Sequence, residues 1–271
     1  MDSAGLYLVG LGPGDLDLMT KRAIDLLRNM DTLFLEGYTA TLPLESENRL
    51  EEIVGPWTRA MRPEIENPEE ILEIAQSSKV GIMVVGDPMQ ATTHVDLILR
   101  AKNLGINTTV VPGISATTLA ISLSGLQSYR FGRQVTIPFN YGDYLPTSPL
   151  EYIDVNYNNN LHTLVLLDLD PTGMGIEKPT PMQPSIVIEL LHLMFERLVE
   201  REEGVRESMN VPISKWDGIL LTDLGTTDQR VIAGNLEDLA LVKGGTVHCL
   251  ILPAKMDELE KEMFQQLSSD T

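Results

Sequence analysis

Three closely spaced glycines follow the first apolar run of the chain. Leu6–Val9 is short and apolar, and Gly10, Gly12 and Gly14 come directly after it, before a helical pattern. Glycine lets the backbone turn sharply and approach a ligand, because no Cβ intervenes. In α/β proteins, ligands bind in loops at the carboxyl ends of strands. The spacing therefore indicates a ligand-binding loop, although a tight turn without any ligand would need the same glycines.

Asp15 ends this loop and limits the ligands that the loop could bind. It stands where the dinucleotide-binding pattern has its third glycine, and a carboxylate there suits a phosphate poorly. The chain contains no Gly-Lys-Ser/Thr, so a P-loop is excluded. A dinucleotide-dependent oxidoreductase is disfavoured, because only Glu36 offers an acidic residue after the second predicted strand.

A second loop of the same kind follows the predicted strand Val80–Val85. Gly86–Pro88 forces a turn there and presents the Asp87 carboxylate at the strand end. Thr93 and His94 then lead into a helix. A ligand site would use this arrangement, and an Asp-Pro turn with a capped helix would also account for it.

A third loop follows the predicted strand Thr108–Val111. Pro112 and Gly113 end the strand, and Ser115 begins a helix of small residues. Small side chains at a helix N-terminus leave room for a bulky ligand, although close packing of a helix on a sheet favours them as well. Because three strand ends carry such loops, we predict one shared ligand site.

The elements that position these loops can be read from hydrophobic periodicity. Strands are also predicted at Thr32–Glu36, Val135–Phe139, Leu164–Leu169, Gly218–Leu224, Val231–Ala233 and His248–Leu252, and helices at Lys21–Met30, Glu69–Gln76, Val95–Leu104, Ile186–Glu203 and Asp257–Leu267. Alternating strands and helices indicate parallel β/α units up to about residue 110. The second half, with several strands and one long helix, indicates a mixed sheet. Tyr141–Pro149 and Pro171–Pro184 are predicted loops. We expect an α/β protein with two domains, residues 1–122 and 123–271.

Composition excludes several classes of function. The net charge of −19 argues against direct binding to nucleic acid or anionic membranes. It favours a solvated acidic surface, or a surface that attracts a basic partner protein. No apolar segment is long enough to span a membrane and no signal peptide is recognised, so we expect a cytoplasmic protein. Cys249 is the only cysteine, and its apolar neighbours predict a buried, inert thiol.

The histidines and two further aspartates give weaker indications of a functional site than the three loops do. The four histidines are too widely spaced to predict a metal site. His192 is expected to be structural, and His248 heads an apolar strand, where it could either pack or contact a ligand. Asp168 and Asp170, as i and i+2 residues of a strand, would face the same side, although capping of the loop at Pro171 is the favoured interpretation.

The three loops, in this order, resemble those of the tetrapyrrole-methylase-like methyltransferases, which use S-adenosylmethionine. That class carries Gly-x-Gly-Pro-Gly-Asp and a following Thr, matched here from Gly10 to Thr20. It also carries Gly-Asp-Pro, matched at Gly86–Pro88, and Pro-Gly-x-Ser-Ala, matched at Pro112–Ala116.

Within that class the chain is most similar to the diphthine synthases, over nearly its whole length. The match is carried by Glu36–Thr39, Gly86–His94, Gly125–Gly132, Leu161–Leu164 and Leu224–Thr226. Ala-Thr-Thr-His at Ala91–His94 is its most specific element. The chain departs from the diphthine synthases in the third loop, which has the general Pro-Gly-Ile-Ser-Ala form, and in Pro171–Pro184.

The resemblance implies two α/β domains with S-adenosyl-L-methionine in the cleft between them. Cofactor contacts carry over to Pro13, Asp87, Gln90, Ser115, Ala116, Leu167, Leu224 and His248. A carboxylate and carbonyls near a sulfonium are favourable, and leucines would hold the adenine. No metal is implied.

The reaction implied is methylation of the amine on a 3-amino-3-carboxypropyl histidine of translation elongation factor 2, which gives diphthine. The sequence identifies no catalytic residue. The resemblance also implies a homodimer, with the elongation factor as its protein partner. The alternatives are a tetrapyrrole or other small-molecule methyltransferase on the same fold, which the third loop slightly favours, and an S-adenosylmethionine-binding regulator without activity.

Overall fold

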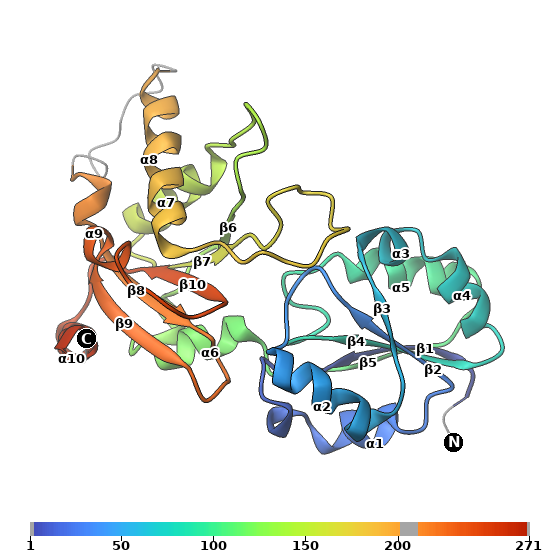
Figure 1. The fold of residues 1–271 in the computed structure, drawn as a ribbon. Helices are drawn as coiled ribbons and strands as arrows, with labels where there is room; N and C mark the ends of the chain where they lie inside the picture. The colour runs from blue at the N-terminus through green and yellow to red at the C-terminus, as the bar shows by residue number, and fades with distance from the viewer. Residues whose placement is uncertain (1–2, 201–210, 270–271) are drawn as a thin grey trace. The chain divides into compact units, whose positions relative to one another are not determined.

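The chain forms two compact units, each with a sheet of its own (Figure 1). The computed structural model describes residues 3–200 and 211–269. Unit 1 comprises Met1–Ala116, Met174–Pro179 and Gly225–Thr227, and unit 2 comprises Thr117–Gly173, Thr180–Leu224 and Asp228–Thr271. The main change of unit therefore falls at residue 116, beside the domain boundary at residue 122 that the sequence predicts.

The sheet of unit 1 is parallel throughout, as predicted. Its strands are β1 (Gly5–Gly10), β2 (Thr32–Glu36), β3 (Thr58–Ala60), β4 (Lys79–Val84) and β5 (Thr108–Val111), in the order β3-β2-β4-β1-β5. The helices between them are α1 (Lys21–Leu27), α2 (Leu44–Val54), α3 (Arg62–Glu66), α4 (Glu69–Ala75) and α5 (His94–Asn103), with a 3-10 turn at Leu16–Leu18. All five carboxyl ends therefore meet at one edge.

Helices cover both faces of this sheet, with α1 and α2 on one side and α3, α4 and α5 on the other (Figure 1). Tyr7 and Val9 of β1 pack on the first side, and Leu6 and Leu8 pack on the second. Every residue of β1 is buried. A continuous apolar run is what a strand covered on both faces requires.

Unit 2 has the mixed sheet that the sequence predicts. Its strands are β6 (Val135–Ile137), β7 (Thr163–Leu167), β8 (Asp217–Thr222), β9 (Arg230–Asn235) and β10 (His248–Leu252), in the order β6-β7-β10-β8-β9. Among these five strands of the described residues, β6 and β7 pair in parallel and the other neighbours pair antiparallel. The helices are α6 (Ala116–Leu123), which begins at the last residue of unit 1, α7 (Ser148–Asn158), α8 (Pro184–Glu200), α9 (Leu236–Leu239) and α10 (Glu258–Ser269), with 3-10 turns at Ser128–Arg130 and Ile213–Lys215.

Two predictions for unit 2 are wrong. The sequence predicts no helix between the strands Val135–Phe139 and Leu164–Leu169, but α7, of 11 residues, lies there. Its aromatic, β-branched and Asn residues are weak helix formers, and burial of Leu150 and Ile153 stabilises it instead. Asp168 and Asp170 do not lie on a strand, because β7 ends at Leu167.

Both carboxylates serve the loop that follows β7. Asp168 Oδ1 accepts the Leu169 and Asp170 amides at 2.8 and 3.2 Å, and Asp170 Oδ1 accepts the amide and the hydroxyl of Thr172. The capping interpretation is confirmed. Residues 201–203 of the predicted helix Ile186–Glu203 lie outside the described part of the chain.

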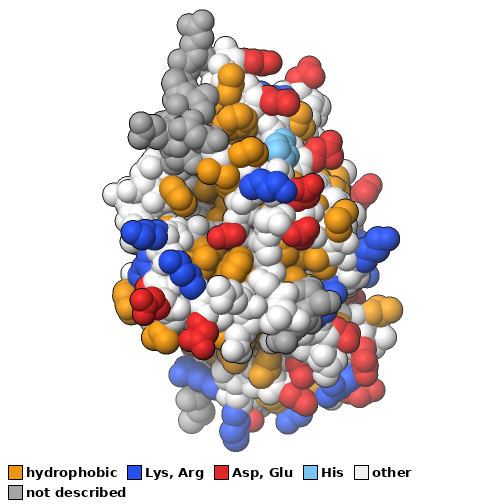
Figure 2. Space-filling view, turned by 90° about the vertical axis from the view of Figure 1, so that its left-hand side faces the viewer, with side chains coloured by type: hydrophobic (Ala, Val, Ile, Leu, Met, Phe, Trp, Pro, Cys, Tyr) orange, Lys and Arg blue, Asp and Glu red, His pale blue; other side chains and the backbone are white. Residues whose placement is uncertain are grey.

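The surface carries both signs of charge despite the net charge of −19. On the face drawn in Figure 2, acidic and basic side chains are interspersed with exposed hydrophobic ones. Within the described residues, no helix combines the length and the apolarity that a membrane crossing needs. Cys249 is buried, and burial raises the pKa of its thiol to about 12, which confirms an inert cysteine.

A buried acid joins distant segments of unit 2. Glu260 of α10 is fully buried and binds the Arg130 guanidinium. His162 places Nε2 3.1 Å from the same carboxylate, while its Nδ1 accepts the Ala254 amide at 3.0 Å. Burial lowers the pKa of His162, so a neutral ring with its proton on Nε2 satisfies both bonds. Arg130 and His162 both come from segments that carry the resemblance stated above, Gly125–Gly132 and Leu161–Leu164.

The Glu260→Ala variant should therefore destabilise unit 2. It leaves Arg130 without its buried partner, and a loss of this kind costs about 3–5 kcal/mol. Urea unfolding, followed by hydrogen exchange of the β7 and β10 amides, would measure the change. Glu258→Ala, at an exposed position of the same helix, should change the unfolding free energy by less than about 0.5 kcal/mol. Equal effects of the two substitutions would contradict this role of Glu260.

Candidate functional site

The three glycine loops lie side by side at the carboxyl edge of the first sheet. They follow β4, β1 and β5, which are neighbours in that order. The Gly86 amide donates to the Gly12 carbonyl at 2.7 Å, and the Gly12 amide donates to the Gly86 carbonyl at 3.2 Å. The Gly113 amide donates to Asp87 Oδ2 at 3.1 Å. The structure thus brings together the three loops from which the sequence predicts one site.

Two of the glycines are required by the loops themselves. A Cβ at Gly10 would lie 2.5 Å from the Gly113 nitrogen and 2.6 Å from the Gly86 oxygen. Gly86 has φ of +81°, and a Cβ there would meet nothing nearer than Ser115 Cα at 3.9 Å. Gly10 therefore permits contact between loops, whereas Gly86 adjoins open space beside the third loop.

The Ala-Thr-Thr-His segment anchors the second loop. His94 Nδ1 donates to the Pro88 carbonyl at 2.7 Å, and Thr92 Oγ1 donates to the same oxygen at 2.8 Å. Asp87 Oδ1 accepts the Met89 amide at 2.8 Å, which tightens the turn. Burial lowers the pKa of His94, so the ring stays neutral. This specific motif therefore shapes the loop that presents Asp87.

The predicted cofactor residues of unit 1 all lie in these loops. Pro13 and Asp87 are half-buried, Ser115 is buried, and Gln90 and Ala116 are exposed. They present a carboxylate, an amide side chain and a hydroxyl at one edge of the sheet.

The predicted cofactor residues of unit 2 also share one edge, that of the second sheet. Leu166 pairs with Cys249, which places Leu167 beside His248, and His248 pairs with Thr222. Leu224 follows β8 by two residues and is buried. Three strands thus bring these residues together, although they are far apart in the sequence.

His248 has one ring nitrogen in use and one available. Its Nδ1 lies 3.0 Å from Thr222 Oγ1, while its buried Nε2 has no hydrogen-bond partner among the described residues. Burial lowers the pKa of His248, so the ring is neutral at pH 7. Asp223 accepts the Thr246 and Val247 amides and so fixes the loop that precedes His248. A buried nitrogen without a partner is what a ligand contact would satisfy.

Glu36 is a functional candidate to which the sequence analysis assigns no role in the site. It is the last residue of β2, at the same edge as the glycine loops, and it is only 1% exposed. Burial raises the pKa of its carboxyl to about 7, against hydrogen bonds from Thr39 and Tyr38 that lower it. The sequence feature that could have indicated a role for Glu36 is an acidic residue at the end of an apolar strand.

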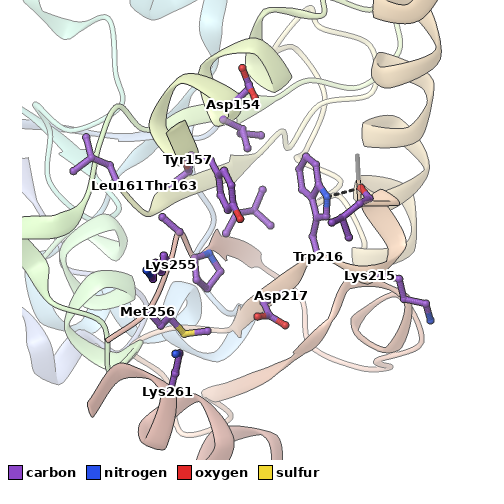
Figure 3. Close-up of a pocket in the computed structure, with 15 residues that line it drawn as sticks. Asp154, Tyr157, Leu161, Thr163, Lys215, Trp216, Asp217, Lys255, Met256 and Lys261 are labelled. Atoms are coloured by element: carbon purple, nitrogen blue, oxygen red, sulfur yellow. Dashed lines mark hydrogen bonds between the residues drawn. The ribbon is translucent and has the colours of Figure 1, made fainter. Parts of the chain in front are cut away.

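A cavity of about 380 Å³ lies elsewhere in unit 2 (Figure 3). Tyr157, Trp216 and Lys261 are among its lining residues, and Trp216 donates to the Val211 carbonyl. Thr163 and Asp217 begin β7 and β8 there, so the cavity lies at the opposite edge of the sheet from Leu167 and His248. No group of three or more metal-binding side chains occurs in the described residues.

Comparison with known proteins identifies the family. Residues 5–240 match the family model of Tetrapyrrole (Corrin/Porphyrin) Methylases. The chain is 36% identical to a diphthine synthase of Methanocorpusculum labreanum, over 97% of this chain and 98% of the relative. It is 34% identical to a diphthine methyl ester synthase of Emericella nidulans, over 98% and 94%.

Solved structures agree with the sequence relatives. A crystal structure from Entamoeba histolytica has a TM-score of 0.82 and 32% identity, over 97% of this chain and 98% of that one. A crystal structure of diphthine synthase has a TM-score of 0.81 and 27% identity, over 97% and 96%. The chain belongs to the tetrapyrrole methylase family, and within it to the diphthine synthases.

Membership confirms several predictions. The fold class is that of the family, with two α/β units, and the protein is a methyltransferase. A methylase requires a methyl donor. The three glycine loops, which predict a ligand site, also carry the resemblance to the family.

Substitution of Gly10 by Ala should disrupt the joined loops. The new Cβ would contact the backbone of both neighbouring loops, and overpacking of this kind costs about 1–3 kcal/mol. Thermal unfolding and cofactor titration would measure the effect. At Gly234 in β9, a Cβ meets nothing nearer than 3.8 Å. Gly234→Ala should therefore be tolerated, and a larger effect there than at Gly10 would contradict the packing role.

Glu36 should make stability depend on pH. A carboxyl whose pKa is raised from 4.5 to about 7 binds more protons when folded. The unfolding free energy should therefore fall as pH rises from about 4.5 to about 7, by up to about 3 kcal/mol. Glu36→Gln should remove this slope, which urea unfolding at a series of pH values would show. An unchanged slope in the variant would contradict the raised pKa.

Proposed function

We propose that this chain transfers methyl groups from S-adenosyl-L-methionine to the amine of the 3-amino-3-carboxypropyl histidine of translation elongation factor 2, which gives diphthine. The match to diphthine synthases over 97% of the chain carries this proposal. The anchored Ala91–His94 segment supports it, because this motif is the most specific element of the resemblance to the diphthine synthases.

The residues present suit such a cofactor. We propose that Pro13, Asp87, Gln90, Ser115 and Ala116 bind it from unit 1, and that Leu167, Leu224 and His248 bind it from unit 2. The open space at Gly86 and the available Nε2 of His248 support these assignments. Asp87 places a carboxylate where a sulfonium would gain attraction, and the leucines offer apolar contact to an adenine. When bound, the cofactor supplies the methyl group and leaves as S-adenosyl-L-homocysteine.

The protein's own task is to position the acceptor amine. In-line transfer needs the nitrogen about 3 Å from the methyl carbon and aligned with the departing sulfur. A free amine is needed, so a proton must leave nitrogen before each transfer. Rigid loops joined by backbone hydrogen bonds are suited to hold such alignment.

Further features belong to the same proposal. We expect a cytoplasmic homodimer that binds the elongation factor as its protein substrate, without nucleic acid or membrane. The acidic surface and the segment Pro171–Pro184, in which Met174 and Ile176 are exposed, would contribute to docking.

A small-molecule acceptor is the second candidate. The general Pro-Gly-Ile-Ser-Ala form of the third loop, at Pro112–Ala116, favours a tetrapyrrole or a related compound over a protein.

Labelled S-adenosylmethionine would separate these two functions. The acceptors compared are elongation factor 2 with the 3-amino-3-carboxypropyl histidine and the same factor without it. We expect label only on the modified factor, and mass spectrometry of the labelled peptide would count the methyl groups. Label on neither factor, with cofactor binding intact, would overturn the proposal and direct the search to small-molecule acceptors.

The His248→Ala variant should bind the cofactor more weakly. Loss of one hydrogen bond to a buried partner corresponds to an increase of up to about tenfold in Kd. Isothermal titration calorimetry with S-adenosylmethionine would measure it. Asp217→Asn is the matched control, because Asp217 begins β8 at the opposite edge of the same sheet. Equal Kd values for wild type and His248→Ala would contradict the assignment of His248.

A further inference from the structure

Glu36 lies in line with the cofactor loops. Leu35 pairs with Met83, so Glu36 stands beside Val84, and Val84 pairs with Gly10 on the next strand. Adjacent strands lie about 4.8 Å apart, so the Cα atoms of Glu36 and Gly10 are about 10 Å apart. One further residue along β4 the chain enters the loop that presents Asp87. The carboxyl group therefore belongs to the same edge as the predicted methyl-donor site.

Alternation along β2 fixes the side on which Glu36 lies. Leu33 and Leu35 pack on the side of α1 and α2, and Phe34 packs on the other. Glu36 therefore shares the side of Phe34, where α5 begins at His94. The same helix start anchors the Pro88 carbonyl. Glu36 and the loop that presents Asp87 therefore both lie on the side of the sheet where α5 begins.

The surroundings of Glu36 compensate its charge only in part, through hydrogen bonds from Thr39 and Tyr38 and the more distant charge of Arg62. Thr39 donates to the carboxylate through Oγ1 at 2.8 Å and through its amide at 3.3 Å. No Lys, Arg or His nitrogen forms an ion pair with it among the described residues, although a carboxylate is rarely buried without one. The charged and titratable groups that face Glu36 are Tyr38, which lies in the loop after β2, and Arg62 and Glu66 of α3.

Each of these neighbours is engaged elsewhere or is uncharged. The Arg62 guanidinium lies over the Tyr38 ring, 5.2 Å from its centroid, and 3.9 Å from Glu66. Burial raises the pKa of Tyr38 to about 12, so its hydroxyl stays protonated. His94 of α5 is neutral, because burial lowers its pKa. A compact cation at this edge of the sheet would supply the charge that Glu36 lacks.

We propose that Glu36 binds the ammonium group of the acceptor and takes a proton from it before each methyl transfer. The inference rests on the function proposed above, which requires an amine acceptor. It makes Glu36 a catalytic residue that contacts substrate.

The proton leaves nitrogen for the Glu36 carboxylate before the methyl group is transferred. An N–H bond of the ammonium breaks, an O–H bond forms on Glu36, and the nitrogen keeps the electron pair. That pair forms the new N–C bond while the C–S bond breaks, and its electrons remain on sulfur. The nitrogen regains a positive charge, and Glu36 releases its proton to solvent. Burial brings the pKa of the carboxyl to about 7, near the pH at which a general base is most effective.

The first test uses Glu36→Gln with the modified elongation factor as acceptor. The amide oxygen can still accept from Thr39, so the loop should keep its structure. General base catalysis contributes about 10²–10⁴-fold, so kcat should fall about 100-fold or more. The Kd for S-adenosylmethionine should stay within about twofold. The rise of kcat/KM with pH up to about 7 in the wild type should be lost in the variant.

A second variant separates catalysis from a structural role of the loop. Thr39→Val keeps the carboxyl but removes the hydroxyl that stabilises its charged form. The pKa of Glu36 should rise, and the acidic limb of the kcat/KM profile should move to higher pH by about half a unit or more. The pH dependence of unfolding, which needs no bound cofactor, should move in the same direction.

Glu66→Gln is the matched control, because it removes a half-exposed acid from the same neighbourhood. It should keep wild-type kcat. If Glu36→Gln retains wild-type kcat and its pH profile, the assignment of Glu36 is overturned. If Thr39→Val shifts the unfolding profile but not the kinetic one, it is also overturned. Failure of the wild type to label the modified factor would instead refute the proposed function, so the two failures are distinguishable.

Discussion

The pair of hydrogen bonds between Gly12 and Gly86 is the constraint on which the arrangement of loops at the carboxyl edge of the first sheet depends. It holds the loops after β1 and β4 in backbone contact, and the bond from Gly113 to Asp87 adds the loop after β5. The loops approach most closely at Gly10, where a Cβ would lie 2.5 Å from the Gly113 nitrogen and 2.6 Å from the Gly86 oxygen. The glycines therefore act first on each other, and through that contact they fix where the Asp87 carboxylate is presented.

Each sheet brings predicted cofactor residues to one of its edges, but the two sheets do so through different strand arrangements. In unit 1, all strands are parallel, so every following loop falls at the same edge without special pairing. In unit 2, the antiparallel register places the start of β10 between the ends of β7 and β8, and so His248 beside Leu167 and Thr222. Away from that edge, Glu260 fixes Arg130 and His162. Arg130 and His162, which lie in segments of the family resemblance, therefore stabilise the fold of unit 2.

Glu36 and His248 show how burial changes ordinary side chains. Burial raises the pKa of the carboxyl and lowers that of the imidazole, so both favour their neutral forms. Asp87, which is half-buried, accepts two backbone amides instead. Carboxyl groups at one sheet edge are therefore placed in different electrostatic environments, and such differences allow one site to both hold a cation and accept a proton.

The sequence by itself determined the parallel sheet, the mixed sheet and the three loops, because hydrophobic period and glycine spacing are local signals. Its motifs also carried the resemblance to the family. It missed α7, whose residues are weak helix formers, and it extended the strand that is β7 to Leu169, two residues beyond its end at Leu167. Only the tertiary structure decided which residues share an edge, since strand order and register join segments far apart in the chain. It alone decided the state of Glu36, because a pKa depends on burial and on neighbours that sequence spacing does not specify.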